Sequence, residues 1–260
     1  MFPYPAEAVM ASFAVILPAA GSSARFKDKE KKPFVNLDGR AVWLRSAELF
    51  VTRTDVAQCL IVISAADEEM FRRRYSANLA FMNVQIVIGG KERFDSVANA
   101  LAMVKPEVEF IAIHDAVRPC LTEALVDAVF AKAQQTGAAL LGVPVSDTLK
   151  KVSGQKQVEA TMPRQGLWLA QTPQVFRKDL LTAAYADRGK LGTDITDDAQ
   201  LVEAAGHTVH IVDSNATNLK LTTRSDLILA EAILKSQPKP KPSGPAHPFA
   251  EEEMWGGRPK

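Results

Sequence analysis

Five short apolar runs recur along the chain and constrain its fold more than any other feature of the sequence. They are Phe13–Leu17, Leu60–Ile63, Val84–Ile88, Phe110–Ile113 and Ala138–Val145. Each run is continuous rather than alternating, which is typical of strands that are covered on both faces, as in a parallel sheet. The sequence therefore predicts an α/β fold with a mostly parallel, Rossmann-like sheet.

Helical patterns lie between and after these runs. The expected helices are Ala41–Phe50, a second that begins at Asp95, Leu121–Gln135 and Asp226–Leu234, and one further strand is expected at His207–Val212. Asp95 has a side chain suited to an N-cap, and Gly137 follows the third helix as a stop signal. Strands that alternate with helices predict right-handed crossovers within one sheet.

Three segments depart from this alternation. Residues 1–12 form an N-terminal extension, and residues 236–260 form a tail rich in Pro, Gly and charge that is expected to be disordered. Within the domain of residues 13–235, the stretch 146–164 is typical of two short polar strands around a Ser-Gly turn. A projecting arm that packs on a partner subunit and a mobile surface flap both fit this hairpin.

The charge balance and the cysteine count restrict the class of function. Lys and Arg total 31 against 30 Asp and Glu, so no general positive field predicts binding to nucleic acid. No stretch approaches the roughly 18 apolar residues of a membrane span. The two cysteines, Cys59 and Cys120, form no disulfide or zinc pattern. We expect a protein of a reducing compartment such as the cytoplasm, with neither membrane nor nucleic acid as partner.

The first apolar run ends in a turn of small residues, LPAAGSSARF. Small side chains at Ala19, Ala20 and Gly21 let backbone N–H groups approach phosphate oxygens. The turn lacks both the P-loop spacing and the three glycines of the dinucleotide fingerprint. Arg25 and Lys32 supply cations that suit a triphosphate, although the charged stretch between them also fits a solvated surface.

A carboxylate follows the fourth apolar run, in the motif HDAVRPC. Asp115 lies at the carboxyl end of the expected strand, where ligands collect in open α/β sheets. A carboxylate among phosphates requires a cation between them, so Asp115 is a candidate ligand of Mg²⁺. Arg118 could grip a second phosphate with its planar fork. A structural ion pair between Asp115 and Arg118 is the alternative.

Further blocks extend these motifs along most of the chain, from about residue 13 to residue 235. In order, the blocks are LPAAGSSARF, KKPF, GGKERFDSV, HDAVRPC, VPVSDTLK, RQGLWLAQTPQVF, TDDAQLVE and NLKLTT. Their order resembles that of the methylerythritol phosphate cytidylyltransferases. The resemblance implies an enzyme that transfers CMP from CTP to 2-C-methyl-D-erythritol 4-phosphate in isoprenoid precursor biosynthesis, with Mg²⁺ or another divalent cation as cofactor.

The resemblance also assigns roles to individual residues. The positions that match residues holding CTP are Ala19, Ala20, Gly21, Gly90 and Ser96. The positions that match cations on the α-phosphate and the leaving pyrophosphate are Arg25, Lys32 and Lys220. Catalysis by such residues is expected to rest on positioning and charge stabilisation, because a phosphate monoester is largely ionised near neutral pH.

The acceptor side of the site is implied by the same resemblance. Asp115, Thr172 and Lys220 match positions on the acceptor side. Arg118, Thr148 and Arg164 match residues associated with the arm and the dimer interface. The family forms homodimers with interlocked arms, so the resemblance favours the projecting arm over the surface flap for residues 146–164.

Three other functions compete with this interpretation. A transferase that uses ribitol 5-phosphate or another polyol phosphate would share the CTP site and differ at the acceptor. A non-catalytic nucleotide-binding paralogue is disfavoured because Arg25, Lys32, Asp115 and Lys220 are all present. A dehydrogenase is disfavoured by the missing glycines. The chain departs from the commonest family pattern at Ser23, where a second glycine is usual and where serine adopts a positive φ less readily than glycine does.

Overall fold

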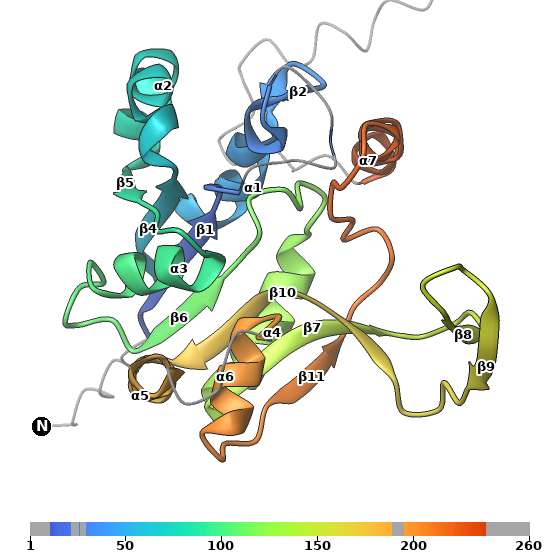
Figure 1. The fold of residues 1–260 in the computed structure, drawn as a ribbon. Helices are drawn as coiled ribbons and strands as arrows, with labels where there is room; N and C mark the ends of the chain where they lie inside the picture. The colour runs from blue at the N-terminus through green and yellow to red at the C-terminus, as the bar shows by residue number, and fades with distance from the viewer. Residues whose placement is uncertain (1–10, 22–25, 27–29, 189–194, 238–260) are drawn as a thin grey trace, which may run out of the picture.

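A computed structural model describes residues 11–21, 26, 30–188 and 195–237. At its centre lies a seven-stranded sheet in the order β11-β7-β10-β6-β1-β4-β5 (Figure 1). The strands are β1 (Phe13–Pro18), β4 (Val56–Ile63), β5 (Val84–Ile88), β6 (Phe110–Ile113), β7 (Ala138–Pro144), β10 (Trp168–Arg177) and β11 (His210–Asp213). β10 runs antiparallel to its neighbours β6 and β7, and the other pairs are parallel. The predicted α/β fold with a mostly parallel sheet is confirmed.

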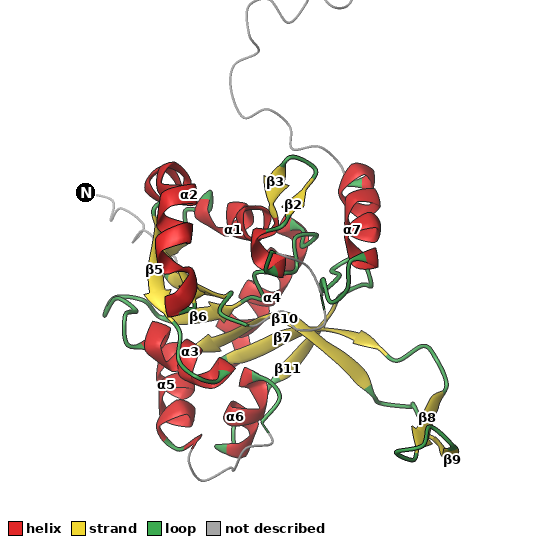
Figure 2. Cartoon of the chain, turned by 45° about the horizontal axis from the view of Figure 1, so that its top comes forward, coloured by secondary structure: helices red, strands yellow, loops and turns green. Residues whose placement is uncertain are grey.

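The sheet is covered on both faces, which explains why its strands are apolar without alternation. In β1, Phe13, Val15 and Leu17 face one core and Ile16 faces the other. The helices on the first face are α1 (Val42–Val51), α2 (Glu68–Met82) and α4 (Glu123–Thr136), and those on the second are α3 (Arg93–Leu101), α5 (Lys178–Ala186) and α6 (Asp198–Ala204) (Figure 2).

Local sequence explains where several helices start and end. The Thr122 hydroxyl caps α4, and Gly137 ends it with a φ of +84°, which glycine adopts without strain. The predicted start of α3 at Asp95 is wrong. The helix begins at Arg93 with Glu92 as N-cap, and the Asp95 carboxylate accepts a hydrogen bond from the Glu92 N–H in a capping box.

Some elements have an apolar sequence pattern that is too weak to predict them. In β10 the buried half contains the polar side chains of Gln171, Thr172 and Gln174, so it does not read as a buried strand. In α2 only Phe71 and Tyr75 are buried, which leaves a narrow apolar face. β11 begins at residue 210 rather than at residue 207 as predicted. In these places tertiary packing, rather than local pattern, determines the structure.

The hairpin predicted within residues 146–164 is present as an arm. Its strands are β8 (Leu149–Val152) and β9 (Val158–Met162), which pair antiparallel in a sheet of their own. Figures 1 and 2 show the arm projecting from the body beyond the ends of β7 and β10. Every residue of β9 is exposed, and no side chain of the arm belongs to either core.

A smaller apolar cluster lies under the last helix, α7 (Ser225–Ser236), where Ala230 packs with Leu221 and Cys120. The remaining short elements are η1 (Lys32–Phe34), β2 (Asn36–Leu37), β3 (Arg40–Ala41) and η2 (Ala65–Asp67). None of the described helices combines the length and the apolar character that a membrane crossing needs. Most of the predicted N-terminal extension and nearly all of the predicted tail lie outside the described residues.

Candidate active site

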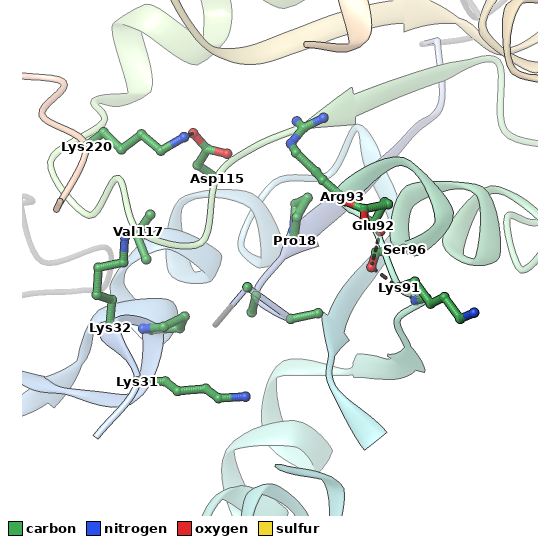
Figure 3. Close-up of a pocket in the computed structure, with 15 residues that line it drawn as sticks. Pro18, Lys31, Lys32, Lys91, Glu92, Arg93, Ser96, Asp115, Val117 and Lys220 are labelled. Carbon is green, nitrogen blue, oxygen red and sulfur yellow. Dashed lines mark hydrogen bonds and ion pairs between the residues drawn. The ribbon is translucent and has the colours of Figure 1, made fainter. Parts of the chain in front are cut away.

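Segments far apart in the sequence meet at the carboxyl ends of β1, β5 and β6, where they enclose a cavity of about 560 Å³ (Figure 3). The cavity is lined by Pro18, Ala19, Ala20, Gly21, Lys31, Lys32, Pro33, Gly90, Lys91, Glu92, Arg93, Ser96, Asp115, Val117 and Lys220. Parallel strands end at the same edge of a sheet, so the turns after these strands converge. This topology brings the predicted motifs into one place.

The turns that follow β1 and β5 touch each other, and glycine makes that contact possible. A Cβ at Gly89 would lie 2.9 Å from the Cβ of Ala20, and a Cβ at Gly90 would lie 2.2 Å from the Cβ of Asp95. The Gly90 N–H donates to Oγ of Ser96 at 3.1 Å, which fixes the second turn. The small residues of both turns therefore pack closely and line the cavity, where large side chains would fill the space.

Asp115 is the buried carboxylate of the cavity, with 7% of the residue exposed. Its Oδ2 lies 2.9 Å from Nζ of Lys220 and 3.4 Å from Nε of Arg118. Burial alone would raise the pKa of the carboxyl, but Lys220, Arg118 and Arg93 together hold that pKa well below its usual range. Asp115 is therefore ionised at neutral pH and surrounded by cations.

A buried chain of hydrogen bonds holds Asp115 from behind. Its N–H donates to Oγ1 of Thr172 at 3.0 Å, and the Thr172 hydroxyl lies 3.2 Å from Nδ1 of His114. Nε2 of His114 lies 3.2 Å from the carbonyl oxygen of Arg118. Burial lowers the pKa of His114 to about 4, so the imidazole is neutral at pH 7. A neutral ring with its proton on Nε2 satisfies every group in this chain.

Arg118 is held within the fold rather than exposed to the cavity. Its side chain is 9% exposed, and Nη1 donates to the carbonyl of Asn218 at 2.7 Å. The structural ion pair with Asp115, weighed above as the alternative, is present. A contact between Arg118 and a second phosphate stays a prediction.

Two adjacent lysines face the cavity from the segment around η1. Nζ of Lys31 lies 2.6 Å from Oδ2 of Asp67 and 3.2 Å from Oγ of Ser64, so this side chain is tied to the end of β4. Lys32 is half-buried and lines the same wall. The sequence indicated Lys32 and not Lys31, because a run of lysines does not show which of them face a pocket.

The predicted site residues separate into groups. Those that line the cavity are Ala19, Ala20, Gly21, Lys32, Gly90, Ser96, Asp115 and Lys220. Thr172 and Arg118 lie behind Asp115 and do not line it. Thr148 and Arg164 are exposed at the base of the arm, outside the lining, where Nη1 of Arg164 donates to the Ser146 carbonyl. Arg25 lies outside the described residues.

Sequence reasoning missed four further charged residues of the lining. These are Lys31, Lys91, Glu92 and Arg93. The last three belong to the GGKERFDSV block, where a charged first helical turn has the composition of a solvated surface as much as of a ligand site. Their position directly after the double glycine is the signal that could have indicated them.

The donor set around Asp115 fits a metal that arrives with a phosphate ligand. Among the described residues, no group of three or more His, Cys, Asp and Glu side chains is placed to hold a metal ion. The ion pairs of the Asp115 carboxylate fall on Oδ2. Mg²⁺ is commonly bound by one or two carboxylates, with phosphate oxygens and waters completing the shell. One ionised carboxylate is sufficient for that kind of site.

Comparison with known proteins identifies a family. The sequence profile of 2-C-methyl-D-erythritol 4-phosphate cytidylyltransferase matches residues 13–236. The chain is 42% identical to the protein of that name from Rhodopirellula baltica, over 86% of this chain and 95% of the relative. It is 38% identical to the protein of the same name from Bacillus velezensis, over 86% of this chain and 97% of the relative.

Solved structures agree with the sequence match. A 4-diphosphocytidyl-2C-methyl-D-erythritol synthase from Anaerococcus prevotii superposes with a TM-score of 0.73 at 28% identity, covering 86% of this chain and 96% of the other. A 2-C-methyl-D-erythritol 4-phosphate cytidylyltransferase from Thermus thermophilus superposes with a TM-score of 0.70 at 31% identity, covering 85% and 98%.

Proposed function

Because the chain belongs to the 2-C-methyl-D-erythritol 4-phosphate cytidylyltransferase family, we propose that the cavity at the ends of β1, β5 and β6 is the site of that family's reaction. The chain is a nucleotidyltransferase that transfers CMP from CTP to 2-C-methyl-D-erythritol 4-phosphate. The products are 4-diphosphocytidyl-2-C-methyl-D-erythritol and pyrophosphate, within isoprenoid precursor biosynthesis. The observation that carries the proposed site is the ion pair between Asp115 and Lys220, placed opposite the backbone of two glycine-containing turns.

The reaction needs little proton transfer. An oxygen of the acceptor phosphate attacks the α-phosphorus of CTP, and the bond from that phosphorus to the oxygen bridging the β-phosphate breaks. Pyrophosphate leaves with the electron pair of that bond. The acceptor phosphate is largely ionised near pH 7, so no strong base is required. Catalysis therefore rests on holding the phosphates in line and stabilising their charge.

The cations of the cavity meet this requirement. Lys32, from η1, and Lys220, from the segment before α7, lie on one side of the cavity, across from Arg93 (Figure 3), and would contact the phosphate oxygens of CTP. Lys220 is held in place by Asp115, which fixes the direction of its ammonium group. The role of Arg25 as a third cation stays a prediction. Lysines that are positioned in advance stabilise developing charge without reorganisation during the reaction.

The two turns would hold the nucleotide by its backbone contacts. Ala20 and Gly21 would present N–H groups to the phosphates, whereas the Ala19 N–H donates to the carbonyl of Val62 at 2.8 Å, so Ala19 would contribute by its small side chain. Gly90 and Ser96 lie at the start of α3 and would contact the cytosine and the ribose. The absence of a Cβ at Gly90 makes room for Asp95 and so allows this turn to pack against the start of α3.

We propose that Mg²⁺ is held by Asp115 together with phosphate oxygens of CTP. Two features support this: the carboxylate lines the cavity 2.9 Å from Nζ of Lys220, and neighbouring cations hold its pKa below the usual range. When bound, the ion neutralises phosphate charge and polarises the reacting phosphorus. Thr172 contributes by fixing the backbone of Asp115.

We propose further that the enzyme acts as a homodimer in which the arm of one chain completes the acceptor site of the other. Exposed apolar side chains on the arm and its base support this; they are Val152, Val158, Met162, Leu167 and Leu169. Thr148 and Arg164 lie on this arm and not in the cavity of their own chain. They would reach the acceptor from the partner subunit. Two buried free cysteines, Cys59 and Cys120, support action in a reducing compartment such as the cytoplasm.

Pyrophosphate release by the purified chain tests the reaction directly. The assay contains CTP, Mg²⁺ and either 2-C-methyl-D-erythritol 4-phosphate or ribitol 5-phosphate, with ATP, GTP and UTP as controls. We expect release with CTP and the methylerythritol phosphate only. Release only with ribitol 5-phosphate would overturn the acceptor, and no release with any pair would leave a nucleotide-binding paralogue.

A further inference from the structure

Arg93 occupies a prominent place in the cavity, and neither the motifs nor the proposed mechanism gives it a role. It is the first residue of α3 and belongs to the lining. Figure 3 shows it on the α3 side of the cavity with its guanidinium toward Asp115. The charge of Arg93 helps to keep Asp115 ionised, so the two groups are within electrostatic range of each other.

The guanidinium is fixed by a carboxylate that is itself fixed. Nη2 of Arg93 donates to Oδ2 of Asp198 at 2.6 Å, and Asp198 has no exposed surface. The other oxygen, Oδ1, accepts the hydroxyl of Tyr185 at 2.6 Å. Asp198 begins α6, where the helix dipole also favours a negative charge. A fully buried carboxylate with both oxygens occupied has little freedom, and neither has the arginine bound to it.

The opposite end of the Arg93 guanidinium is unsatisfied. Nη1 is buried and has no hydrogen-bond partner within the described part of the chain. The side chain as a whole is 30% exposed, and its exposed part borders the cavity. An unpaired buried donor of this kind is commonly satisfied by an ordered water, so a ligand in the cavity would contact the exposed part of the Arg93 side chain.

We propose that Arg93 is a further substrate-binding residue, whose guanidinium is anchored on Asp198 and binds a phosphate group in the cavity. With Lys220 on the far side of Asp115, a phosphate there would contact cations on two sides. Asp198 offsets part of the charge of Arg93, so the arginine acts most strongly on a group in direct contact with it. The inference rests on the proposed function of the cavity. The phosphate belongs to CTP or to the acceptor, and the chemistry of recognition is the same for both.

A purely structural role would also explain the ion pair, because Arg93 and Asp198 connect α3 to α6. A second ion pair that involves α3 provides a matched control. Arg188, at the end of α5, binds Asp95 of α3, is 34% exposed and also has a buried, unpaired Nη1. Arg188 does not line the cavity. Comparing substitutions of the two arginines therefore distinguishes the loss of an ion pair to α3 from the loss of a contact with substrate.

Steady-state kinetics of Arg93→Met and Arg188→Met test the proposal. We expect Arg93→Met to raise one KM by about tenfold to a hundredfold, the loss of one charge-assisted hydrogen bond. Arg188→Met should leave both KM values within about threefold of the wild type, since surface ion pairs contribute little. Calorimetric titration of CTP without acceptor identifies the source: weakened CTP binding assigns the phosphate to CTP, and unchanged CTP binding with a raised acceptor KM assigns it to the acceptor.

Two conservative variants keep the test decisive if Arg93→Met does not fold. In Arg93→Lys a single ammonium nitrogen replaces the forked guanidinium, so it cannot bind Asp198 and the phosphate equally well at the same time. The same KM should therefore rise, but by less than in Arg93→Met. In Asp198→Asn the anchor loses its charge, and the same KM should again rise. Near-ultraviolet circular dichroism verifies the fold of each.

Unchanged KM values in Arg93→Met or Arg93→Lys would overturn the proposal, and so would an equal rise in Arg188→Met. The proposed function is tested separately by the same preparations. A wild-type chain that releases no pyrophosphate contradicts the function, whereas an active wild type with unaffected Arg93 variants contradicts only the role of Arg93.

Discussion

At the cavity, polar side chains are buried and hold one another, whereas on the arm apolar side chains are exposed. Asp115 is 7% exposed, yet Val158 on β9 is 62% exposed. β10 joins the two regions, and its own residues change from exposed at Trp168–Ala170 to buried at Gln171–Phe176. The contacts of Asp115 with Thr172, Arg118 and Lys220 are all made within one chain. The arm exposes apolar side chains, which agrees with the proposed contact with a second chain.

This difference divides the predicted site residues by location. Lys220 and Thr172 are held by contacts inside their own chain, so their substitution should affect activity or stability directly. Thr148 and Arg164 are exposed on the arm and should act through assembly. Matched substitutions in the two regions test that division.

The largest expected effect is on catalysis. Lys220→Ala should reduce kcat by about 10²- to 10³-fold, by analogy with the loss of one donor to a developing oxyanion. The matched arm variant is Lys151→Ala, whose lysine lies 3.2 Å from Glu159 in an exposed ion pair. It should retain nearly full activity in pyrophosphate release. Equal activity in the two variants would contradict the charge-stabilising role of Lys220.

The next effect is the dependence of stability on pH. The pKa of buried His114 is lowered to about 4 from 6.5, so between these values the unfolded chain binds the proton more tightly than the folded chain. The contribution of His114 to the free energy of unfolding is complete above pH 6.5. Roughly 3 kcal/mol of that free energy is lost as the pH falls to 4. Urea unfolding across this range measures the slope. His114→Gln should flatten it, and an unchanged slope would assign the loss to other groups.

A smaller effect is expected from single hydroxyl groups. Thr172→Val leaves the Asp115 N–H and Nδ1 of His114 without a partner, which should cost about 1–3 kcal/mol of stability. The arm equivalent is Thr161→Val, whose exposed hydroxyl accepts from Nζ of Lys150 at 2.6 Å. Thermal unfolding should show a clear loss for the first variant and almost none for the second. Similar losses would mean that the buried hydroxyl of Thr172 contributes no more to stability than the exposed hydroxyl of Thr161.

The smallest expected effect is the change in stability when an exposed ion pair of the arm is removed. Lys151→Ala removes an ion pair whose side chains are 66% and 44% exposed, so stability should change by less than about 0.5 kcal/mol. Urea unfolding measures this change. A loss above about 1 kcal/mol would show that Lys151 makes stabilising contacts beyond this ion pair, for example with a second chain.

The sequence predicted the parts of the site that depend on strand ends and on backbone shape. Short apolar runs followed by small residues located the turns at Gly21 and Gly90, and the end of β6 located Asp115. These predictions succeeded because parallel strands bring their carboxyl ends together whatever their order in the sheet. The double glycine is required by packing, as the 2.2 Å approach at Gly90 shows.

The remaining features depend on contacts between distant segments. Thr172 meets Asp115 across 57 positions of sequence, and Arg118 meets Asn218 across 100. A pattern along the chain does not show which polar side chains such contacts will bury. Arg93 was missed for a related reason, since a charged residue in the first turn of a helix faces solvent more often than a cavity.

We propose that the cavity of one chain and the arm of another form each site. Mixing two variants that are each expected to be inactive tests this proposal most directly. Lys220→Ala and Arg164→Ala, with different affinity tags, are coexpressed and the hybrid is verified by tandem purification. If the arm acts on the partner, each hybrid contains one intact site. The unfractionated mixture should then recover about a quarter of wild-type activity, since random pairing makes half of the dimers hybrid. Purified hybrids with no more activity than the parent variants would contradict the account.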